Sequence, residues 1–474
     1  MNLFKKFIQF SIGNGVVLLL GFISSPIITR IIDPNEMGKF SMFNTVTNLL
    51  LVFVLLGIDQ SYVRYYYDEE EDNRRKLLRE CLRIPLIANS VVGILIIIFF
   101  KPISEYIIDE KSIKFVILLI IHLILSTISR FAMLQVRMKQ RANFYSILNI
   151  ISKFSYLILI GILLKIYNNN YLILVLATII SNALMGLIAI IFEKKEWFNL
   201  NRDSKIKVKR NEIIKYGIPF VFSMAITWIF QSIDRVSIKE FCGYGEVGLY
   251  SGAMNIISLL NAFQGAFSTF WTPIAYERYN KDSNDKEFFS KVNKIVSIIM
   301  LFIAIILITA KDFIVLLLGE KYREAAFIFP YLVFMPIMYT ISETTVLGIN
   351  FKKKTKSHIY IAIISAVFNL IGNLILVPKY GAKGAAISTG IAYIIFFISR
   401  TYISNRYYKV NYSLGKFAIA TTFTYILATY SSFNKFNSII LLLSTVLVST
   451  IILLYKEEFN EGIKFIRNSI KRLN

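Results

Sequence analysis

Charged side chains inside long apolar runs are the residues of this sequence that could carry chemistry. Six of them lie within stretches dominated by Leu, Ile, Val and Phe, namely Asp59, Arg130, Lys153, Asp234, Arg235 and Glu343. At the centre of a lipid-facing helix, each charge would cost roughly 2.5–3.5 kcal/mol. We therefore expect these side chains to pair with one another or to face water. Lys153 is the clearest case, because it lies in the middle of its apolar run.

The sign of this set indicates the kind of ligand it could hold. With Arg30 included, the cations are Arg30, Arg130, Lys153 and Arg235, and the acids are Asp59, Asp234 and Glu343. A water-filled cavity with a small positive excess attracts an anion such as a pyrophosphate or an acidic sugar. The carboxylates would hold the cations in place or couple transport to an ion gradient. The alternative for Arg30, Arg130 and Glu343 is that they reach the membrane surface, since they lie nearer the ends of their runs.

Uncharged polar residues form seams along four of the apolar runs. They include Asn14 and Ser25 in the first run, Asn48 in the second, Trp228 and Gln231 in the seventh, and Asn255 in the eighth. A single seam is explained by helix packing, because small and polar side chains hold membrane helices together. Four seams at equivalent places in the two halves of the chain favour a shared cavity, which these side chains would line.

The elements that must position these residues are membrane-spanning helices. The chain has 474 residues, of which 55% are hydrophobic and 18% charged, whereas soluble domains average about 25% charged residues. Stretches such as VVGILIIIFF (91–100) belong to apolar segments of roughly 20 residues, which is enough to cross a bilayer. The sequence therefore predicts an all-α polytopic membrane protein with about fourteen transmembrane helices. The predicted spans are 7–32, 40–63, 81–100, 113–135, 143–166, 170–192, 213–241, 248–274, 291–310, 324–350, 358–378, 383–403, 413–432 and 436–455.

The distribution of charge predicts the orientation of these spans. The net charge is +23, and most of the 53 Lys and Arg residues fall in alternate loops. This positive-inside pattern places both termini in the cytoplasm. The basic excess then indicates contact with anionic lipids, with no nucleic acid as a partner. The longest loops, at 64–80, 193–212 and 275–290, contain no patterned core that could form a catalytic domain.

A repeated hexamer indicates an internal duplication. EMGKFS at 36–41 returns as EVGLYS at 246–251, so that residues 36 and 246 are 210 positions apart. At a similar displacement, VRYYYDEEED (63–72) corresponds to IAYERYNKDS (274–283). We expect two homologous six-helix lobes with the same orientation, arranged around a central cavity. Glycine at the third position of each hexamer would permit a tight outer hairpin.

These patterns divide the chain into five predicted parts. They are an N-lobe at 1–192, a cytoplasmic linker at 193–212, a C-lobe at 213–404, two appended spans at 405–455 and a tail at 456–474. In the tail, Phe459, Ile463, Ile466, Ile470 and Leu473 recur at helical spacing with basic residues between them. This pattern is typical of an amphipathic helix that lies on the inner membrane surface.

Several apparent motifs do not indicate a cofactor or a metal. GYGEVG (243–248) matches GxGxxG, but it lies between membrane helices without the βαβ context of a dinucleotide site. His122 and His358 are too far apart in the sequence to suggest a metal site. Cys81 and Cys242 are expected on opposite sides of the membrane, where they cannot form a disulfide. We expect no cofactor, and coupling to protons or to sodium stays open.

Five segments resemble a known family of transporters. They are LGFISSPIITRIIDPNEMGKFS (20–41), DQSYVRYYYDEE (59–70), the Asp234–Arg235 pair followed by EVGLYS, WTPIAYERY (271–279) and VPKYGAKGAAISTGIAY (377–393). In this order and spacing they resemble the polysaccharide repeat-unit flippases. These Wzx-type proteins belong to the multidrug/oligosaccharidyl-lipid/polysaccharide exporter superfamily. The resemblance extends from about residue 7 to residue 410 and is weaker in the final spans.

The resemblance implies a fold and an activity. It implies two six-helix lobes that face a central cavity, with two extra helices. It also implies that the protein flips undecaprenyl-pyrophosphate-linked oligosaccharide across the bacterial cytoplasmic membrane by alternating access and is not an enzyme. The glycan could be a capsule, an O-antigen or a related polysaccharide. A polysaccharide polymerase and glycosyltransferases are then the expected protein partners.

Three alternatives are less favoured. A lipid II-type flippase would carry a cluster of cavity arginines, which we cannot place in this sequence. A multidrug antiporter of the same superfamily is disfavoured because the first span has no carboxylate before Asp33. A membrane-embedded polymerase or glycosyltransferase would need catalytic groups at the outer surface, where all predicted loops are short.

Overall fold

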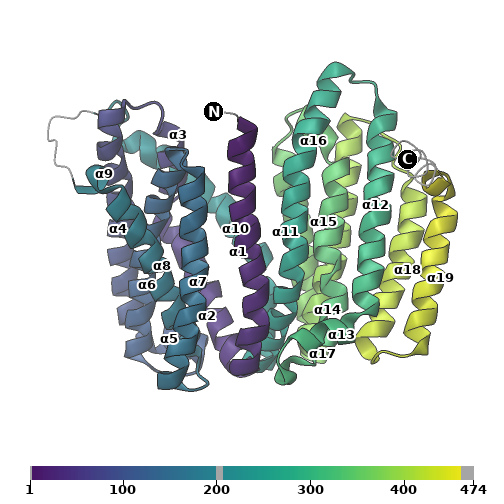
Figure 1. Cartoon of the computed structure of the whole chain (residues 1–474), viewed down its shortest axis with the longest axis horizontal. Coiled ribbons are helices and arrows are strands. Elements are labelled where there is room, and N and C mark those ends of the chain that lie inside the picture. Colours follow the sequence, from purple (N-terminus) through teal and green to yellow (C-terminus); the bar gives the residue numbers. More distant parts are fainter. Residues whose placement is uncertain (1–2, 199–205, 461–474) are drawn as a thin grey trace, which may run out of the picture. The chain divides into compact units, whose positions relative to one another are not determined.

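The secondary structure is helical in the part of the chain that the structure describes. The computed structural model describes residues 3–198 and 206–460, and within the first helix the side chains only from residue 15 onward, residues 17 and 18 excepted. In these residues the helices are joined by short turns, without a strand (Figure 1). The predicted all-α fold class is confirmed. Most of the predicted tail helix, from residue 461 onward, lies outside the described residues.

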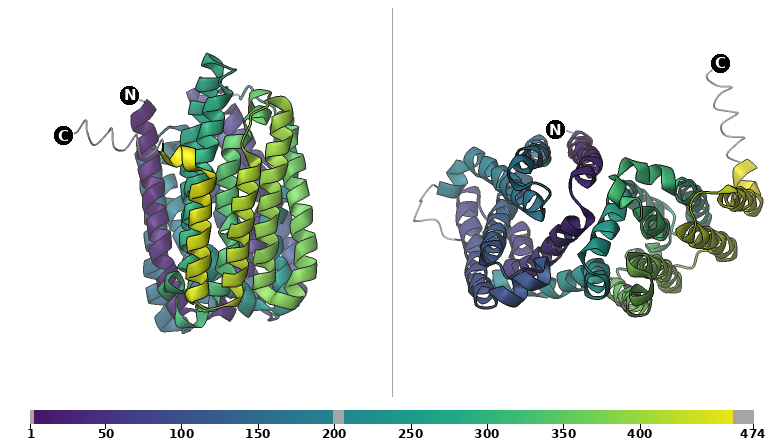
Figure 2. Two further views of the ribbon diagram at one scale, coloured as in Figure 1. Left: turned by 90° about the vertical axis from the view of Figure 1, so that its right-hand side faces the viewer. Right: turned by 90° about the horizontal axis from the view of Figure 1, so that it is seen from below.

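The chain divides into two compact units, residues 1–235 and residues 236–474. The long helices of each unit run side by side along a common direction (Figures 1 and 2). The helix α10 begins in the first unit and ends in the second. The helices that begin in the first unit are α1 (Leu3–Ile31), α2 (Pro34–Leu55), α3 (Ile58–Tyr65), η1 (Glu71–Asn73), α4 (Arg74–Ile98), α5 (Phe100–Ile108), α6 (Ile113–Met138), α7 (Ala142–Tyr167), α8 (Tyr171–Phe192), α9 (Lys194–Phe198) and α10 (Arg210–Cys242).

The second unit continues in the same helical pattern. Its helices are α11 (Tyr244–Lys281), α12 (Lys286–Thr309), α13 (Lys311–Ile314), η2 (Val315–Leu317), η3 (Glu320–Tyr322), α14 (Ala325–Leu332), α15 (Phe334–Thr345), α16 (Leu347–Phe351), α17 (Lys356–Tyr407), α18 (Leu414–Phe433) and α19 (Ser438–Leu454). The lobe boundaries predicted from the sequence repeat, with the C-lobe starting at 213, stay a prediction.

The helices are those of a multi-pass membrane protein. In the described residues, nine helices are long and apolar enough to cross a membrane, and Leu19–Ile31 and Ser438–Leu454 are shorter apolar helices. Each predicted span coincides with helical structure. Two of them, 358–378 and 383–403, fall within α17, where the backbone of Gly381 leaves the helical region at φ 59° and ψ −139°. Because glycine tolerates this conformation, α17 consists of two helices that meet in a tight turn.

One predicted span is interrupted by residues with a left-handed backbone. The run 40–63 forms α2 and α3 instead of a single helix, because Leu56 and Gly57 both adopt left-handed backbone conformations with φ of 51° and 68°. A continuous right-handed helix cannot pass through two such residues. The interruption is supported by α10, whose residue Ile213 accepts a hydrogen bond from Ser61 Oγ at 2.7 Å. Contacts of this kind explain why most of α10 belongs to the first unit.

The repeated hexamer makes the same contact in each unit. Glu36 Oε2 accepts a hydrogen bond from the backbone N–H of Tyr171, the first residue of α8, at 2.8 Å. Glu246 Oε2 accepts one from the backbone N–H of Ala382, directly after the turn in α17, at 2.9 Å. In both units the glutamate of the hexamer thus supplies an acceptor for the free N–H groups at the start of a helix. This contact accounts for the glutamate of the repeat. The hexamer glycines, Gly38 and Gly248, lie within α2 and α11, and their expected role in a tight hairpin stays a prediction.

A second pair of matched contacts joins neighbouring helices. Asn89 of α4 donates its side-chain amide to Thr127 Oγ1 of α6 at 2.9 Å. In the second unit, Asn293 of α12 donates to Thr344 Oγ1 of α15 at 2.8 Å. Hydrogen bonds between polar side chains hold membrane helices together. Their recurrence at corresponding places is what two copies of one helical unit would produce.

Candidate functional site

The break between α2 and α3 determines where Asp59 lies. A Cβ atom on Gly57 would come within 2.2 Å of the carbonyl oxygen of Gly217 in α10, so only glycine fits at this position. The backbones of the two helices therefore touch directly. Asp59 follows in the first turn of α3, where the positive end of the helix dipole favours an anion.

Asp59 forms an ion pair with Arg130 of α6. Arg130 Nη2 lies 2.9 Å from Asp59 Oδ2, and Gln60 Nε2 donates to the same oxygen at 3.0 Å. The Asp59 side chain is completely buried, whereas that of Arg130 is 51% exposed. Within the described residues, Asp59 Oδ1 has no hydrogen-bond partner. The pair thus combines a sequestered carboxylate with a cation that is still half available to a ligand.

Lys153 lies on α7 beside α1. A Cβ atom on Gly21 would be 3.8 Å from Lys153 Cε, so the stem of the lysine packs against the first helix. Its ammonium nitrogen lies 5.1 Å from the centre of the Tyr156 ring, within the range of a cation–π contact. In the described part of the chain, the half-buried ammonium group of Lys153 makes no ion pair. It is therefore a cation at mid-span that an external anion could neutralise.

Glu343 also forms an ion pair, with a residue that the sequence analysis did not select. Arg400 Nη1 of α17 lies 2.7 Å from Glu343 Oε1 of α15, and the two side chains are only 7% and 11% exposed. The same nitrogen donates to Ser342 Oγ at 2.7 Å, and the guanidinium group lies over the Tyr339 ring. Glu343 is thereby fixed inside the second unit by charge pairing. Arg400 was missed because it lies near the end of its predicted span, where an arginine is commonly an interfacial anchor.

Of the remaining charged residues, Arg30 lies at a helix end, and Asp234 and Arg235 lie about two turns before the end of α10. Arg30 is exposed in the last turn of α1. Asp234 is buried in α10, and the neighbouring Arg235 Nη1 donates to the carbonyl oxygen of Gln231 at 3.4 Å. Within the described residues of the first unit, no ion pair joins Arg30, Lys153 or Arg235 to the Asp59–Arg130 pair. Within the first unit, the structure brings Asp59 and Arg130 together.

The polar residues predicted to line the cavity differ in their exposure and contacts. Trp228 Nε1 donates to the carbonyl oxygen of Thr45 at 2.9 Å, which fastens α10 to α2. Ser25 is buried, Asn48 and Gln231 are exposed, and Asn255 is half-buried. The side chain of Asn14 lies outside the described residues. The role of these residues as a cavity lining stays a prediction.

Comparisons with known proteins relate the chain to polysaccharide biosynthesis. A family model described as "Polysaccharide biosynthesis protein" matches residues 3–277. An uncharacterized membrane protein of Methanocaldococcus jannaschii is 26% identical over 426 residues, which cover 82% of this chain and 82% of that protein. The capsular polysaccharide biosynthesis protein CapF of Staphylococcus aureus is 24% identical over 430 residues, covering 85% and 99%.

Solved transporter structures share the fold. The lipid II flippase MurJ in an inward closed conformation has a TM-score of 0.66 at 18% identity, covering 95% of this chain and 99% of that chain. An inward-facing multidrug resistance transporter of the MATE family, from the MOP superfamily, has a TM-score of 0.55 at 12% identity, covering 82% and 94%. At these identities the likeness is one of fold.

The family match and the fold agree with each other. The matched residues 3–277 form more than half of the chain and include the segments that carry Asp59, Arg130 and Lys153. The family resemblance predicted from the sequence is thereby confirmed. The chain belongs to the polysaccharide biosynthesis protein family, whose match here coincides with the helical fold of MOP-superfamily transporters.

Proposed function

We propose that this protein is a flippase that moves undecaprenyl-pyrophosphate-linked oligosaccharide repeat units across the bacterial cytoplasmic membrane. Family membership supports a role in polysaccharide biosynthesis, and the fold shared with MurJ supports transport of a lipid-linked substrate. The similarity to CapF supports a capsule or a related cell-surface glycan as the destination. The two lobes would alternate between inward-open and outward-open states, while the lipid tail stays in the bilayer.

The observation that carries this proposal is the state of Lys153. An ammonium group at the centre of a membrane helix is costly unless an anion compensates it. Since no carboxylate of the described residues pairs with Lys153, a pyrophosphate head group would supply the missing charge. Arg130, half-exposed beside the buried Asp59, would offer a second contact. Guanidinium and ammonium groups are the usual partners of phosphate oxygens.

The other predicted residues would take supporting roles. Arg30, at the end of α1, and Arg235, within α10, would attract the head group, and Asp234 would balance the charge. Asp59 would hold Arg130 when no substrate is present. It is also a candidate for coupling, because protonation of its carboxylate would release Arg130; proton and sodium gradients both fit this role. Asn14, Ser25, Asn48, Trp228, Gln231 and Asn255 would line the path of the sugar.

The surroundings of the protein follow from this function. Both termini would lie in the cytoplasm, as the positive-inside pattern predicts. Glycosyltransferases that build the repeat unit and the polymerase that consumes it would be functional partners. We propose no cofactor, no nucleic-acid partner and no catalytic activity of the chain itself, since moving a substrate between leaflets forms no covalent bond.

The proposal is tested by substitution of Lys153 in a strain that lacks the chromosomal gene. Lys153→Ala should lower surface glycan about ten- to hundredfold, the loss expected for one charge-assisted hydrogen bond of about 1.5–3 kcal/mol. Lipid-linked repeat units should accumulate on the inner leaflet. Lys165→Ala, at the exposed end of the same helix, is the matched control. If Lys153→Ala and Arg235→Ala both export glycan normally at normal protein levels, the assigned cavity is wrong.

The MATE-like fold makes drug export the second candidate. The same deletion strain distinguishes the two functions. A drug antiporter would raise the resistance of the cell, so its deletion should increase susceptibility to cationic drugs. Unchanged lipid-linked intermediates together with increased drug susceptibility would refute glycan flipping.

A further inference from the structure

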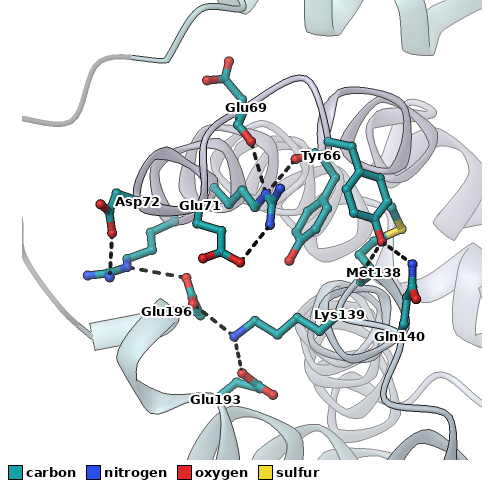
Figure 3. A network of polar contacts seen from close by, with 12 residues as sticks. Tyr66, Glu69, Glu71, Asp72, Met138, Lys139, Gln140, Glu193 and Glu196 are labelled. Carbon is teal, nitrogen blue, oxygen red and sulfur yellow. Dashed lines mark hydrogen bonds and ion pairs between the residues drawn. The ribbon is translucent and has the colours of Figure 1, made fainter. Parts of the chain in front are cut away.

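A polar pocket lies at the end of the first unit where three loop segments meet. Its walls come from residues 66–75 between α3 and α4, from residues 138–141 between α6 and α7, and from Glu196 of α9 (Figure 3). The pocket has a volume of about 480 Å³. It contains none of the charged residues assigned above to transport. The topology predicted from the sequence places it on the cytoplasmic side.

Two of the pocket cations are tightly held. Lys139 Nζ contacts Glu193 Oε2 at 2.6 Å and Glu196 Oε1 at 3.0 Å, and Arg141 Nη1 lies 2.6 Å from Glu193 Oε1. The Glu193 side chain is almost fully buried. These pairs fix the 138–141 loop to the end of α8 and to α9. They are the structural part of the pocket.

The other two cations, Arg74 and Arg75, have weaker partners. Arg74 Nη1 lies 3.7 Å from Glu71 Oε1, and Arg75 Nη2 lies 3.5 Å from Asp72 Oδ1. The two acids are 89% and 90% exposed. Ion pairs of this kind contribute little, because water screens them and the exposed side chain is free to leave. A stronger anion could therefore replace Glu71 and Asp72.

The arginines are already oriented for such an exchange. Arg74 Nε donates to the carbonyl oxygens of Tyr66 and Glu69, and the guanidinium group lies 4.7 Å from the centre of the Tyr66 ring (Figure 3). Arg75 Nε lies 3.5 Å from Glu196 Oε2 but is buried without a hydrogen-bond partner in the described residues. A pre-oriented guanidinium fork matches the geometry of phosphate oxygens.

Neighbouring aromatic residues place the pocket at the level of lipid head groups. Phe192 at the end of α8 and Phe198 at the end of α9 are 67% and 69% exposed, next to Glu193 and Glu196. Exposed aromatic side chains at helix ends are typical of the membrane–water interface. Basic pockets between membrane helices at this level bind the head groups of anionic lipids.

We propose that this pocket binds the phosphate head group of an anionic membrane lipid, with Arg74 and Arg75 as its ligands and Glu71 and Asp72 displaced. The lipid would occupy the pocket independently of the transported glycan. By linking the α3–α4 loop to the lipid, it would stabilise the loop network of the first unit.

The test is lipid binding to the purified full-length protein, measured by native mass spectrometry. Phosphatidylglycerol and phosphatidylcholine are titrated separately onto the wild-type protein and its variants. Arg75→Gln and Arg74→Gln should each weaken the first phosphatidylglycerol adduct about tenfold, as expected for a lost charge-assisted contact. Phosphatidylcholine adducts should not change. Lys352→Gln with Lys356→Gln, two exposed lysines between the end of α16 and the start of α17, is the control.

A variant that should strengthen lipid binding tests the proposal even if the arginine variants fold poorly. Glu71→Gln with Asp72→Asn removes two exposed competitors of the head group and should tighten phosphatidylglycerol binding. Equal phosphatidylglycerol adducts in this double variant and in the wild-type protein would overturn the proposal. Competition by inorganic phosphate at concentrations equal to those of the lipid would also overturn it, since the pocket would then take a free anion.

Discussion

The two members of the Asp59–Arg130 pair differ in their access to solvent. The carboxylate is completely buried, while half of the guanidinium side chain is exposed. Removing one partner of an ion pair is costly mainly when the partner left behind stays buried. Loss of Arg130 should therefore destabilise the protein more than loss of Asp59, although Asp59 is the more deeply buried residue.

This asymmetry predicts the order of stability among three variants. Arg130→Ala leaves a buried carboxylate without its cation and should lower the free energy of unfolding by about 3–5 kcal/mol. Asp59→Ala leaves Arg130 exposed to water and should cost about 1 kcal/mol or less. The double variant should recover most of the loss. Thermal unfolding of the purified proteins measures the order, and a larger loss for Asp59→Ala would mean that Arg130 faces lipid.

Lys139, a loop residue of the first unit, stays protonated to a higher pH than an ordinary lysine because its pKa is raised. Burial alone would lower the pKa of Lys139, but the hydrogen bonds with Glu193 and Glu196 outweigh it and raise the pKa. A raised pKa in the folded state means that the stabilisation is complete below the unfolded value and is lost as the pH rises through the folded value. The contribution of Lys139 should therefore be constant around neutral pH.

The corresponding experiment compares the wild-type protein with Lys139→Met. The difference between their unfolding temperatures should be the same between about pH 6 and pH 9 and should shrink above about pH 10.5, the ordinary range for lysine. The other titrating groups are common to both proteins, so the difference in unfolding temperature reports the loss of the charged contacts of Lys139. A difference that already disappears below pH 9 would contradict the raised pKa.

At this scale the sequence predicts which residues matter better than it predicts their partners. Asp59 and Arg130 were both selected because charges inside apolar runs are costly, but their pairing depends on the packing of α3 against α6. Arg400 was not selected, since a residue near the end of a span has an interfacial explanation. Which side chains pair between two helices depends on how the helices are aligned with each other. The hydrophobic periodicity of one helix does not determine that alignment.

Among the elements, the interrupted span formed by α2 and α3 is held by a contact between two glycines. The left-handed backbone of Gly57 and the carbonyl oxygen of Gly217 leave no room for a side chain. A single glycine in an apolar run does not by itself indicate that a helix is interrupted, so the sequence predicted a continuous helix. The break became necessary only when α10 packed against it.

Substitution of Gly57 should therefore be severe. Gly57→Ala combines an unfavourable left-handed conformation with a collision against α10 and should cost about 2–5 kcal/mol. Gly161→Ala in α7, where a Cβ atom would meet nothing within 4 Å, is the matched control and should be neutral or slightly stabilising. Protein yield and unfolding temperature in detergent measure both. Equal behaviour of the two variants would exclude the close contact with Gly217.

The contacts of Glu36 and Glu246 predict a matching effect at the starts of two helices. Glu36→Ala and Glu246→Ala each remove an acceptor for a backbone N–H at a helix start and should cost about 0.5–2 kcal/mol. Glu240→Ala, which removes an exposed acid, is the control. Hydrogen exchange at Tyr171 and Ala382 should increase only in the variant that lacks the corresponding glutamate. Unchanged exchange at both sites would refute the common role.

For the whole molecule, the fold class was predictable because membrane spans need little more than length and hydrophobicity. The apolar runs coincide with helices throughout the described residues, and the turn in α17 separates two spans that the sequence already separated. The duplication was predicted from the hexamer and from other segments that recur at a similar displacement, and the matched contacts in the two units support it. The assignment of α10 to a unit was not, since it depends on contacts such as the hydrogen bond between Trp228 and Thr45.

The predicted orientation can be tested with the two natural cysteines. Cys242 is exposed at the end of α10, and Cys81 is buried in α4. A membrane-impermeant maleimide added to intact cells should label Cys242 and should not label Cys81 before denaturation. Cys242→Ser is the control for background labelling. Labelling of Cys242 only after the membrane is permeabilised would reverse the orientation.

The contact between Glu246 and the turn in α17 also restricts how this protein can evolve. Gly381 has φ 59° and ψ −139°, a backbone conformation that is essentially restricted to glycine, and a Cβ atom there would also lie 2.8 Å from Glu246 Oε2. In the first unit the residue before Tyr171 is Asn170, which has an extended backbone and leaves Glu36 undisturbed. Lineages that keep the turn should therefore keep glycine at position 381 even where the acid at position 246 is lost, whereas position 170 should vary more, a difference that aligned descendants of the duplicated ancestor would reveal.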